Sequence, residues 1–491
     1  MSNSERMAPI DTTWLRMERP TNLMVIVGVL VLKGPVDVAR LETILAERLL
    51  AIPRFRQRTE LRQTGYWWSD DPQFDVARHI KRIRLPGAAD KPELERFVAE
   101  LASSPLDPAH PRWQFHIVED YEGGAAVVAR IHHAIGDGVA MIGVLLSLTD
   151  GHAGTASLEP PRAADERDHG AWLEIVRSLV GALGGGWRLS IETLRKSLQA
   201  VENPAQLLRQ GTGVAAELAY LLLMPNDTPT RLKGTLSGSK RIAWSDPIAL
   251  PEIKAVSNTL GCSVNDMLLA AVAGALNGYL AGKGDATRGV EIRALVPINL
   301  RQPGSSQPLG NHFGVVAVEL PVGLDNPLAR VHEIRRRMEA LKTSYEPPVT
   351  LGLLEALGYA PQAVQDMVFD LLLSRATAVM TNVPGPQLPL YLAGSELSEA
   401  MFWVPQSGNI GMGVSILSFN GRVQFGLITD KALVPDPEAI VDRFKPEFEQ
   451  LLYFVLLGDA AEPPRVQPTR RRMAKGGSNA KRARSRARRS P

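Results

Sequence analysis

Cysteine is almost absent from this chain of 491 residues, in which Cys262 is the only one. A single cysteine excludes a disulfide framework within the chain and is typical of proteins in a reducing compartment. The first 20 residues also lack the basic and apolar segments of a secretory signal. No uninterrupted apolar run reaches the roughly 18 residues that span a bilayer. These absences predict a cytoplasmic protein, or one that associates peripherally with a membrane.

The motifs of several common enzyme classes are missing as well. The sequence has no G-x-x-x-x-G-K-[ST] phosphate loop, no G-x-G-x-x-G between a strand and a helix, and no G-x-S-x-G nucleophile elbow. It has no H-E-x-x-H pair and no cluster of cysteine and histidine that could hold a metal. Cys262 could be a nucleophile, but a lone cysteine at a helix start is more often inert packing. The sequence therefore predicts neither a metal nor a resident cofactor.

Acidic residues are missing from the end of the chain, where residues 465–491 contain eleven Lys and Arg and no Asp or Glu. Without this segment 44 basic and 52 acidic residues remain, so the formal net charge of +3 conceals a body with a net charge of −8. We expect residues 461–491 to form a disordered basic tail, because they have almost no apolar residues to bury. The tail could aid solubility or attract anionic lipid headgroups, at about 1 kcal/mol per basic residue near the surface. It has no aromatic residue to stack on bases, so no specific nucleic-acid binding is expected.

Residues 1–150 show a mixed pattern of strands and helices. The apolar, β-branched run at 23–32 predicts a buried strand. Leu41, Ile44 and Leu49 recur at helical spacing and predict a helix that begins near Asp37. Further strands are predicted at 66–70, 74–85 and 125–131, and a further helix at 138–150.

Residues 151–235 are predicted to connect two halves of the protein. Residues 151–170 are rich in Ala, Pro, Gly and charged residues, which is typical of a linker. Five apolar residues then repeat at spacings of 4, 3, 4 and 3, as on one stripe of a helix: Trp187, Ile191, Leu194, Leu198 and Val201. Such helices could bridge the halves or lie on a membrane surface, and bridging is the simpler interpretation.

Residues 236–460 again alternate between strand-like and helix-like segments. Gly261 is expected to close one helix, and Ser263 is a plausible N-cap of the next. Strands are predicted at 240–246, 289–301, 311–322, 376–386 and 408–430, and helices at 250–261, 263–280, 327–341 and 437–456. The sequence thus predicts a mixed α/β (α+β) protein with two halves of similar size.

Two adjacent histidines stand out at the end of the strand predicted for 125–131. His132 and His133 are followed by Asp137 between Gly136 and Gly138, in the sequence HHAIGDG. Side chains alternate between the faces of a strand, so the two histidines cannot both point into one cavity. One is a candidate base, since a neutral imidazole can take a proton from a hydroxyl, and the other is expected to be structural. The glycines allow the backbone to turn where a side chain would be blocked.

Less specific interpretations of these residues remain open. A histidine at a strand end is usually a satisfied core residue, and Asp137 could cap the following helix or pair with a buried arginine. Adjacent histidines diverge, so a metal site is unlikely to use both. A base without a nucleophile or a metal favours direct transfer, in which the substrate supplies the attacking oxygen.

The segment HHAIGDG matches the H-H-x-x-x-D-G signature of chloramphenicol acetyltransferase-like acyltransferases, which include peptide-synthetase condensation domains. More closely, the chain resembles the bacterial wax ester synthase/diacylglycerol acyltransferase family. The resemblance extends over residues 8–457 through PIDTTWLRMERPTNLMVI, PLDPAHPRW, SVNDMLLAAVAGAL, LGNHFG, TNVPGP and SGNIGMGVSILSFNG. H-H-x-x-x-D-G alone occurs in many acyltransferases, whereas the ordered set of segments is specific.

The resemblance implies two linked, condensation-domain-like halves with a tunnel between them. A fatty acyl-CoA would enter from one side, and diacylglycerol or a long-chain alcohol from the other. In this family pattern His133 is the general base, His132 supports it, and Asp137 has a structural role, for which we expect an ion pair with Arg301. Asn265 is implicated in the active site, although Asn265 and Asp266 could also cap a helix. The expected reaction yields triacylglycerol or a wax ester and needs no cofactor besides the acyl-CoA substrate.

The chain departs from the family pattern at Arg112, where the family commonly has leucine. This residue would place a charge near the acyl path and puts the chain-length preference in doubt. Two other functions are alternatives to the family's reaction. A condensation-type enzyme would use carrier-protein thioesters, but no carrier segment is present. A non-catalytic lipid-surface protein would not need the complete motif. We expect a cytoplasmic enzyme peripherally associated with the inner membrane or with lipid inclusions.

Overall fold

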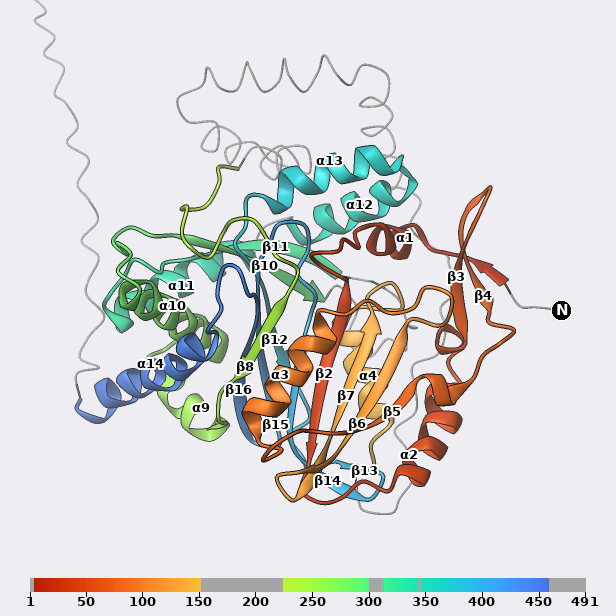
Figure 1. Ribbon diagram of the computed structural model, residues 1–491. Coiled ribbons are helices and arrows are strands. Elements are labelled where there is room, and N and C mark those ends of the chain that lie inside the picture. Colours follow the sequence, from red (N-terminus) through yellow and green to blue (C-terminus); the bar gives the residue numbers. More distant parts are fainter. Residues whose placement is uncertain (1–3, 152–223, 300–310, 312, 343–345, 459–491) are drawn as a thin grey trace, which may run out of the picture.

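The computed structural model describes residues 4–151, 224–299, 311, 313–342 and 346–458 (Figure 1). Two large sheets stand side by side in it, and helices pack around them. The predicted bridging helices, the basic tail and Arg301 lie outside the described residues. The predicted mixed α/β architecture with two sheet-and-helix halves is confirmed.

The first large sheet has six strands and contains the predicted strand at the start of the chain. Its neighbours are antiparallel except for β5 and β6, which run parallel. Every residue of the two central strands β2 and β7 is buried, which explains the continuous apolar sequence of β2 and the largely apolar one of β7. In order across the sheet, the strands are β13 (Tyr391–Leu392), β14 (Ser395–Trp403), β2 (Val25–Leu32), β7 (Gly124–His132), β6 (Trp113–Tyr121) and β5 (Ile80–Arg84).

The second large sheet has a path of six strands, and a seventh strand pairs with it to the side. β12 runs parallel to both of its neighbours, and the other pairs are antiparallel. In order, the strands are β11 (Phe313–Leu320), β10 (Ile292–Asn299), β12 (Ala378–Pro384), β15 (Met412–Phe419), β16 (Arg422–Asp430) and β8 (Lys240–Trp244), and β9 (Ile248–Ala249) pairs with β16.

The predicted division into two halves does not separate the two sheets. β13 and β14 lie beyond residue 236 in the sequence, yet β14 pairs with β2 in the first sheet. β14 also contacts β15 and β16 of the second sheet, and the rings of Trp403 and Trp244 lie 5.8 Å apart between them. β14 thus connects the two halves, because its backbone pairs within the first sheet while it also packs against the second sheet.

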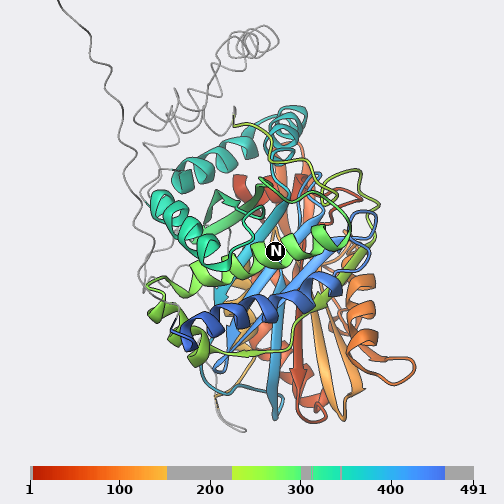
Figure 2. The same ribbon diagram turned by 90° about the vertical axis from the view of Figure 1, so that its left-hand side faces the viewer.

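Helices of the second half cover the outer face of the second sheet. α10 (Val264–Gly282) packs against α11 (Pro327–Lys342) and α14 (Glu438–Leu456), and Figure 2 shows α10 and α14 lying across the strands. Ser263 is the N-cap of α10, as the sequence predicts, and it forms a capping box with Asp266. α10 is long and apolar enough to cross a membrane, but most of it is buried within the fold, as in the core helix of a globular domain.

Other helices surround the first sheet and the end of the molecule near β11. α1 (Pro9–Arg16) packs on α12 (Glu346–Tyr359), and α13 (Gln362–Leu373) continues that layer (Figure 1). α3 (Lys91–Ala102) of the first half contacts β8 of the second sheet, which adds a further link between the halves. The remaining elements are α2 (Val38–Ile44), a π-helical turn (Leu45–Leu49), 3-10 turns at Pro53–Phe55 and Val76–Arg78, α3 (Lys91–Ala102), α4 (Gly138–Ser147), α9 (Leu250–Thr259), and a small sheet of β1 (Ser4–Arg6), β4 (Gly65–Asp70) and β3 (Gln57–Arg62).

Candidate active site

The two histidines lie where β7 ends and a short turn leads into α4. β7 ends at His132, His133 begins the turn, and α4 begins at Gly138. The backbone N–H of His133 donates to the carbonyl of Met24 at 2.8 Å, so the turn is held by the chain segment next to β2. Asp137 is the N-cap of α4, and its carboxylate accepts a 2.8 Å hydrogen bond from the N–H of Ala140. The cap fixes where the helix starts and therefore fixes the turn.

Gly136 and Gly138 flank Asp137 in this turn, and Gly136 is buried. Gly138 does not have a left-handed backbone, so conformational freedom is not the reason for this glycine. A Cβ at Gly138 would come within 3.2 Å of the Val404 side chain, and the position is therefore tight. At Gly138 close packing accounts for the glycine, and not a backbone conformation that favours glycine.

The histidine side chains diverge, as their positions at a strand end predict. His132 is fully buried, and its Nδ1 accepts a 3.1 Å hydrogen bond from the N–H of Ala134. The neutral ring therefore carries its proton on Nε2, which lies 3.6 Å from Oε2 of Glu18. Burial lowers the pKa of His132. These contacts make His132 part of the packing that supports the turn.

Arg112 lies on the same side of the turn as His132. Its guanidinium donates a 2.7 Å hydrogen bond to Oε2 of Glu18, the carboxylate next to His132. Burial alone would raise the pKa of Glu18, but His132 and Arg112 together hold it below its ordinary value. Arg112 is not among the residues that line the cavity described below. Arg112 therefore does not place its charge in this cavity, because it is paired with Glu18 beside His132.

His133 points to the other side, into a group of aromatic residues. Its ring centroid lies 4.4 Å from that of Trp14 on α1 and 5.8 Å from that of Phe313 on β11. Burial lowers the pKa of His133 to about 4, although the nearby charge of Asp137 acts in the opposite direction. The imidazole is thus neutral at neutral pH and can accept a proton.

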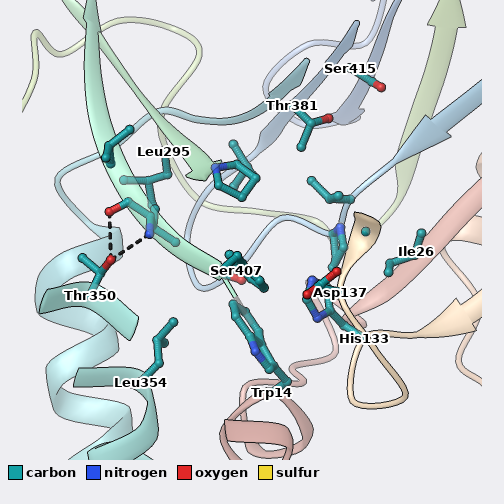
Figure 3. A pocket seen from close by; sticks show the side chains of 18 of the residues that line it. Trp14, Ile26, His133, Asp137, Leu295, Thr350, Leu354, Thr381, Ser407 and Ser415 are labelled. Carbon is teal, nitrogen blue, oxygen red and sulfur yellow. Dashed lines mark hydrogen bonds between the residues drawn. The ribbon is translucent and has the colours of Figure 1, made fainter. Parts of the chain in front are cut away.

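A cavity of about 450 Å³ opens beside His133. Figure 3 shows His133 and Asp137 together on one side of it, with Trp14 next to them and Leu295, Thr350 and Leu354 opposite. Most of the lining is apolar, and it comes from both large sheets and from α1, α4, α12 and α13. The Thr350 hydroxyl is already engaged, because it donates to the carbonyl of Val315 at 3.0 Å and accepts from its N–H at 2.7 Å. The volume and lining suit a hydrophobic ligand.

Two residues without a predicted role connect α1 to the turn. Asn311 donates from Nδ2 to Oδ1 of Asp11 at 2.8 Å and to the backbone carbonyl of His133 at 3.2 Å. Burial raises the pKa of Asp11 to about 6, although its hydrogen bond with Asn311 counteracts part of this shift. The segments PIDTTW and LGNHFG, on which the family resemblance rests, contain Asp11, Trp14 and Asn311. Nothing in the sequence indicates that these two segments meet at His133.

Asn265 lies outside the set of cavity-lining residues, but it is close to one of them. Its Oδ1 accepts a 2.9 Å hydrogen bond from Nδ2 of Asn382, and Asn382 lines the cavity. Asp266, the next residue, completes the capping box of α10 with Ser263. The two interpretations of this pair therefore separate: Asp266 caps the helix, and Asn265 supports a side chain of the cavity wall.

Groups of three or more His, Cys, Asp or Glu residues that could hold a metal do not occur within the part of the chain that the structure describes. Cys262 is a partly buried free thiol, and burial raises its pKa to about 11. A thiol of this kind is a poor nucleophile at neutral pH, since the thiolate is the reactive form. The cavity next to His133 thus remains the candidate active site.

Two family models match most of the chain. A model described as the wax ester synthase/diacylglycerol acyltransferase catalytic domain matches residues 7–268, and one described as the WS/DGAT C-terminal domain matches residues 309–452. A Mycobacterium tuberculosis protein named as a probable diacylglycerol O-acyltransferase is 26% identical over 415 residues, which are 83% of this chain and 86% of that protein.

Two solved structures share the fold. The wax ester synthase/diacylglycerol acyltransferase from Marinobacter aquaeolei VT8 superposes with a TM-score of 0.65 at 21% identity, over 92% of this chain and 100% of that one. The first condensation domain of the calcium-dependent antibiotic synthetase superposes with a TM-score of 0.56 at 13% identity, over 94% and 97% of the two chains. The family resemblance seen in the sequence is confirmed, and the chain belongs to the wax ester synthase/diacylglycerol acyltransferase family of acyltransferases.

Proposed function

We propose that the protein transfers a fatty acyl group from acyl-CoA to the hydroxyl of diacylglycerol or of a long-chain alcohol. The observation that carries this proposal is a neutral imidazole, that of His133, in the wall of a large apolar cavity. Such a base can activate a hydroxyl, and such a cavity can accept hydrocarbon chains. The named relatives add support, because diacylglycerol O-acyltransferases and a wax ester synthase are among them.

In the proposed mechanism His133 takes the proton of the acceptor hydroxyl while the oxygen attacks the thioester carbonyl. The C–O bond forms, and a tetrahedral intermediate develops. The intermediate collapses as the C–S bond breaks, and the thiolate of coenzyme A takes the proton from the imidazolium. Atoms and charges balance without a metal, a resident cofactor or a covalent enzyme intermediate.

Neighbouring groups are suited to assist this base. The charge of Asp137 raises the pKa of His133 and so opposes the effect of burial, which means that it stabilises the imidazolium formed in the reaction. Asn311 holds the backbone carbonyl of His133 and is itself held by Asp11. We assign Asp137 an electrostatic and capping role. Asn311 has a positioning role, and His132 has a structural one.

Attack by an acceptor hydroxyl requires that water be kept from the thioester, since water would give hydrolysis instead of transfer. The apolar lining around His133 favours this exclusion. The condensation domain at 13% identity supports the shared fold alone and does not favour carrier-protein thioesters as substrates. A non-catalytic lipid-surface role would not explain why a buried, neutral histidine lies in the wall of the cavity.

The products would be insoluble in water, so we place the enzyme peripherally at the cytoplasmic face of the inner membrane or on lipid inclusions. The residues 465–491, which hold eleven Lys and Arg, could be attracted to anionic headgroups. Truncation after Pro464 should leave turnover on micellar substrate unchanged and weaken binding to anionic vesicles, mostly at low salt. Equal vesicle binding by the full-length and truncated proteins would exclude the tail as the anchor.

The reaction itself can be tested by following the thiol released from palmitoyl-CoA. Hexadecanol, dioleoylglycerol and no acceptor form the three arms of the assay, with the His133→Ala variant as the catalytic control. Thiol release that depends on an acceptor and yields the matching ester supports the proposal, and the preferred acceptor follows from the rates. Release that is equal in all three arms would indicate a thioesterase instead.

A further inference from the structure

The cavity beside His133 ends against a second, much smaller pocket of about 20 Å³. Three residues line both spaces and therefore form the partition between them: Ile142, Phe402 and Leu417. The wall behind the partition is formed by the end of α4, the segment after β12, and parts of β14 and β15. The residues that line only this second pocket are Leu30, Leu145, Leu146, Thr149, Gly385, Pro386, Leu390, Leu397, Ala400 and Phe419.

The ring of Phe402 has a fixed place in this partition. Phe402 on β14 pairs with Gly28 on β2, and a Cβ at Gly28 would come within 2.7 Å of two ring carbons of Phe402. The ring therefore lies directly over the glycine and could not stay there if position 28 carried a side chain. The Phe402 backbone is held as well, because its carbonyl accepts a hydrogen bond from the Ser415 hydroxyl.

The space behind the partition suits hydrocarbon and nothing polar. Among the described residues that line it, Thr149 has the one polar side chain, and its hydroxyl donates to the carbonyl of Leu146 at 2.7 Å. All its other lining side chains, where the residue is not glycine, are apolar. A polar group placed there would lose its hydrogen bonds to water, whereas methylene groups would be transferred favourably.

We propose that Phe402, together with Ile142 and Leu417, sets the maximum length of the hydrocarbon chain that the active site accepts. This inference rests on the proposed acyl transfer. The chain extends from the reacting carbonyl or hydroxyl near His133 along the apolar cavity until its end meets the partition. A chain that is too long cannot place its reacting group at His133, and opening the partition lets its last carbons enter the second pocket.

The test is the chain-length profile of the Phe402→Ala variant. One arm varies the donor through lauroyl-, palmitoyl- and arachidoyl-CoA with one fixed acceptor, and the other varies the alcohol through dodecanol, hexadecanol and eicosanol with palmitoyl-CoA. Burying one additional methylene is worth about fourfold in kcat/KM, so we expect the ratio of the longest to the middle substrate to rise about tenfold or more. The arm in which the ratio rises identifies which chain reaches the partition.

Phe419→Ala is the matched control, because Phe419 lines the second pocket but not the main cavity. It removes the same atoms without opening the partition, so the ratio should stay near that of the wild type. A double variant, Phe402→Ala with Ala400→Leu, refills the second pocket and should reverse the gain.

If Phe402→Ala does not accumulate as folded protein, Ile142→Ala opens the same partition from α4 and is judged by the same ratio. Unchanged ratios in both arms would overturn the inference. That outcome differs from a failure of the proposed function, in which the wild-type protein would show no acceptor-dependent thiol release from any donor.

Discussion

The two large sheets contribute to the active site in different ways. The first sheet presents His133 just after the end of β7, and charged groups from segments next to this sheet surround the turn, among them Glu18, Arg112 and Asp137. The second sheet contributes mainly apolar side chains from β10, β11, β12 and β15 to the opposite wall. The chemistry is therefore concentrated in a few adjacent residues, whereas the space for the substrates is spread over distant ones.

This difference has a physical basis. Proton transfer needs one base at a defined position, and a short segment can provide it. A cavity that binds hydrocarbon needs a large apolar surface, and side chains from several segments of the chain must contribute to it. Substitutions at the turn should therefore change the rate of the reaction, while substitutions on the second sheet should change which chains bind or how firmly the wall is held.

The largest effect is expected from His133→Ala. Loss of the general base should reduce kcat by about 10²- to 10⁴-fold, as is usual for such a group, without loss of the fold. Acceptor-dependent thiol release measures the rate, and circular dichroism verifies the fold. Turnover close to that of the wild type would show that the first sheet does not carry the base.

His132→Ala should act on stability instead of on the chemical step. The ring is fully buried and accepts the N–H of Ala134, so its removal leaves a cavity and an unpaired donor. A loss of about 2 kcal/mol or more in the free energy of unfolding is expected, with reduced soluble yield. Denaturant unfolding gives the value. A well-folded His132→Ala protein without any turnover would reverse the roles of the two histidines.

Asp137→Asn separates the charge of this residue from its capping role. Asparagine caps a helix about as well as aspartate, so α4 should keep its start. Loss of the charge removes the contribution that raises the pKa of His133 and stabilises its imidazolium, and we expect kcat to fall about tenfold, which corresponds to about 1.4 kcal/mol in the activation barrier. A lower melting temperature would additionally indicate the ion pair with Arg301. An unchanged rate would contradict the electrostatic role.

The pH profile of kcat/KM should reflect the lowered pKa of His133. The reaction needs the neutral imidazole, which persists down to a pH of about 4, whereas an ordinary histidine would be half protonated at 6.5. We expect a plateau through the neutral range and an acid limb well below 6.5, over the range in which circular dichroism shows a folded protein. An acid limb near 6.5 would show that the ring is hydrated in the functioning enzyme.

Stability should also depend on pH, and groups near the site contribute in opposite directions. His133 binds its proton more weakly in the folded protein, so its contribution is present above 6.5 and is lost as the pH falls towards 4. Asp11 binds its proton more tightly when folded, so its contribution is present below 3.8 and is lost as the pH rises through about 6. His116 has a pKa lowered to about 4 by burial and adds to the His133 effect, which is why the kinetic profile is the sharper measurement.

The smallest effect is expected on the second sheet from Thr350→Val. The Thr350 hydroxyl links α12 to both backbone groups of Val315 on β11, and its loss should cost about 1 kcal/mol in the free energy of unfolding. Thr350→Ser retains the hydroxyl and serves as the control. The chemical step should be nearly unaffected. A loss of kcat comparable with that of His133→Ala would show that the second sheet also determines the rate of the reaction.

Local features were the most predictable part of the molecule. The buried strand at Val25–Leu32, the capping residue Ser263 and the diverging histidines all follow from patterns within a few residues. No element was predicted for 346–373, although α12 and α13 form there, because α12 begins with two prolines and its apolar residues show no clear stripe. These helices owe their place to packing against α1 and β11.

Contacts between distant segments could not be predicted. Asp11 and Asn311 are 300 residues apart, and no local pattern announces that they meet behind His133. The partition at Phe402 depends on Gly28 in the same way, since neither residue has an unusual sequence context. The family resemblance supplied the role of His133 but not these partners, because residue order within a motif does not specify what packs against it.

The late pairing of β14 with β2 has a consequence for the synthesis of the protein. β2 ends at Leu32, and its partner begins only at Ser395. At the usual rate of translation, of about 5 to 20 residues per second, the apolar edge of β2 waits roughly 20 to 70 seconds for that partner. An unpaired apolar edge is a template for aggregation. The nascent first half therefore needs protection on the ribosome, and a fragment that stops before Ser395 should be insoluble even though it contains the complete histidine motif.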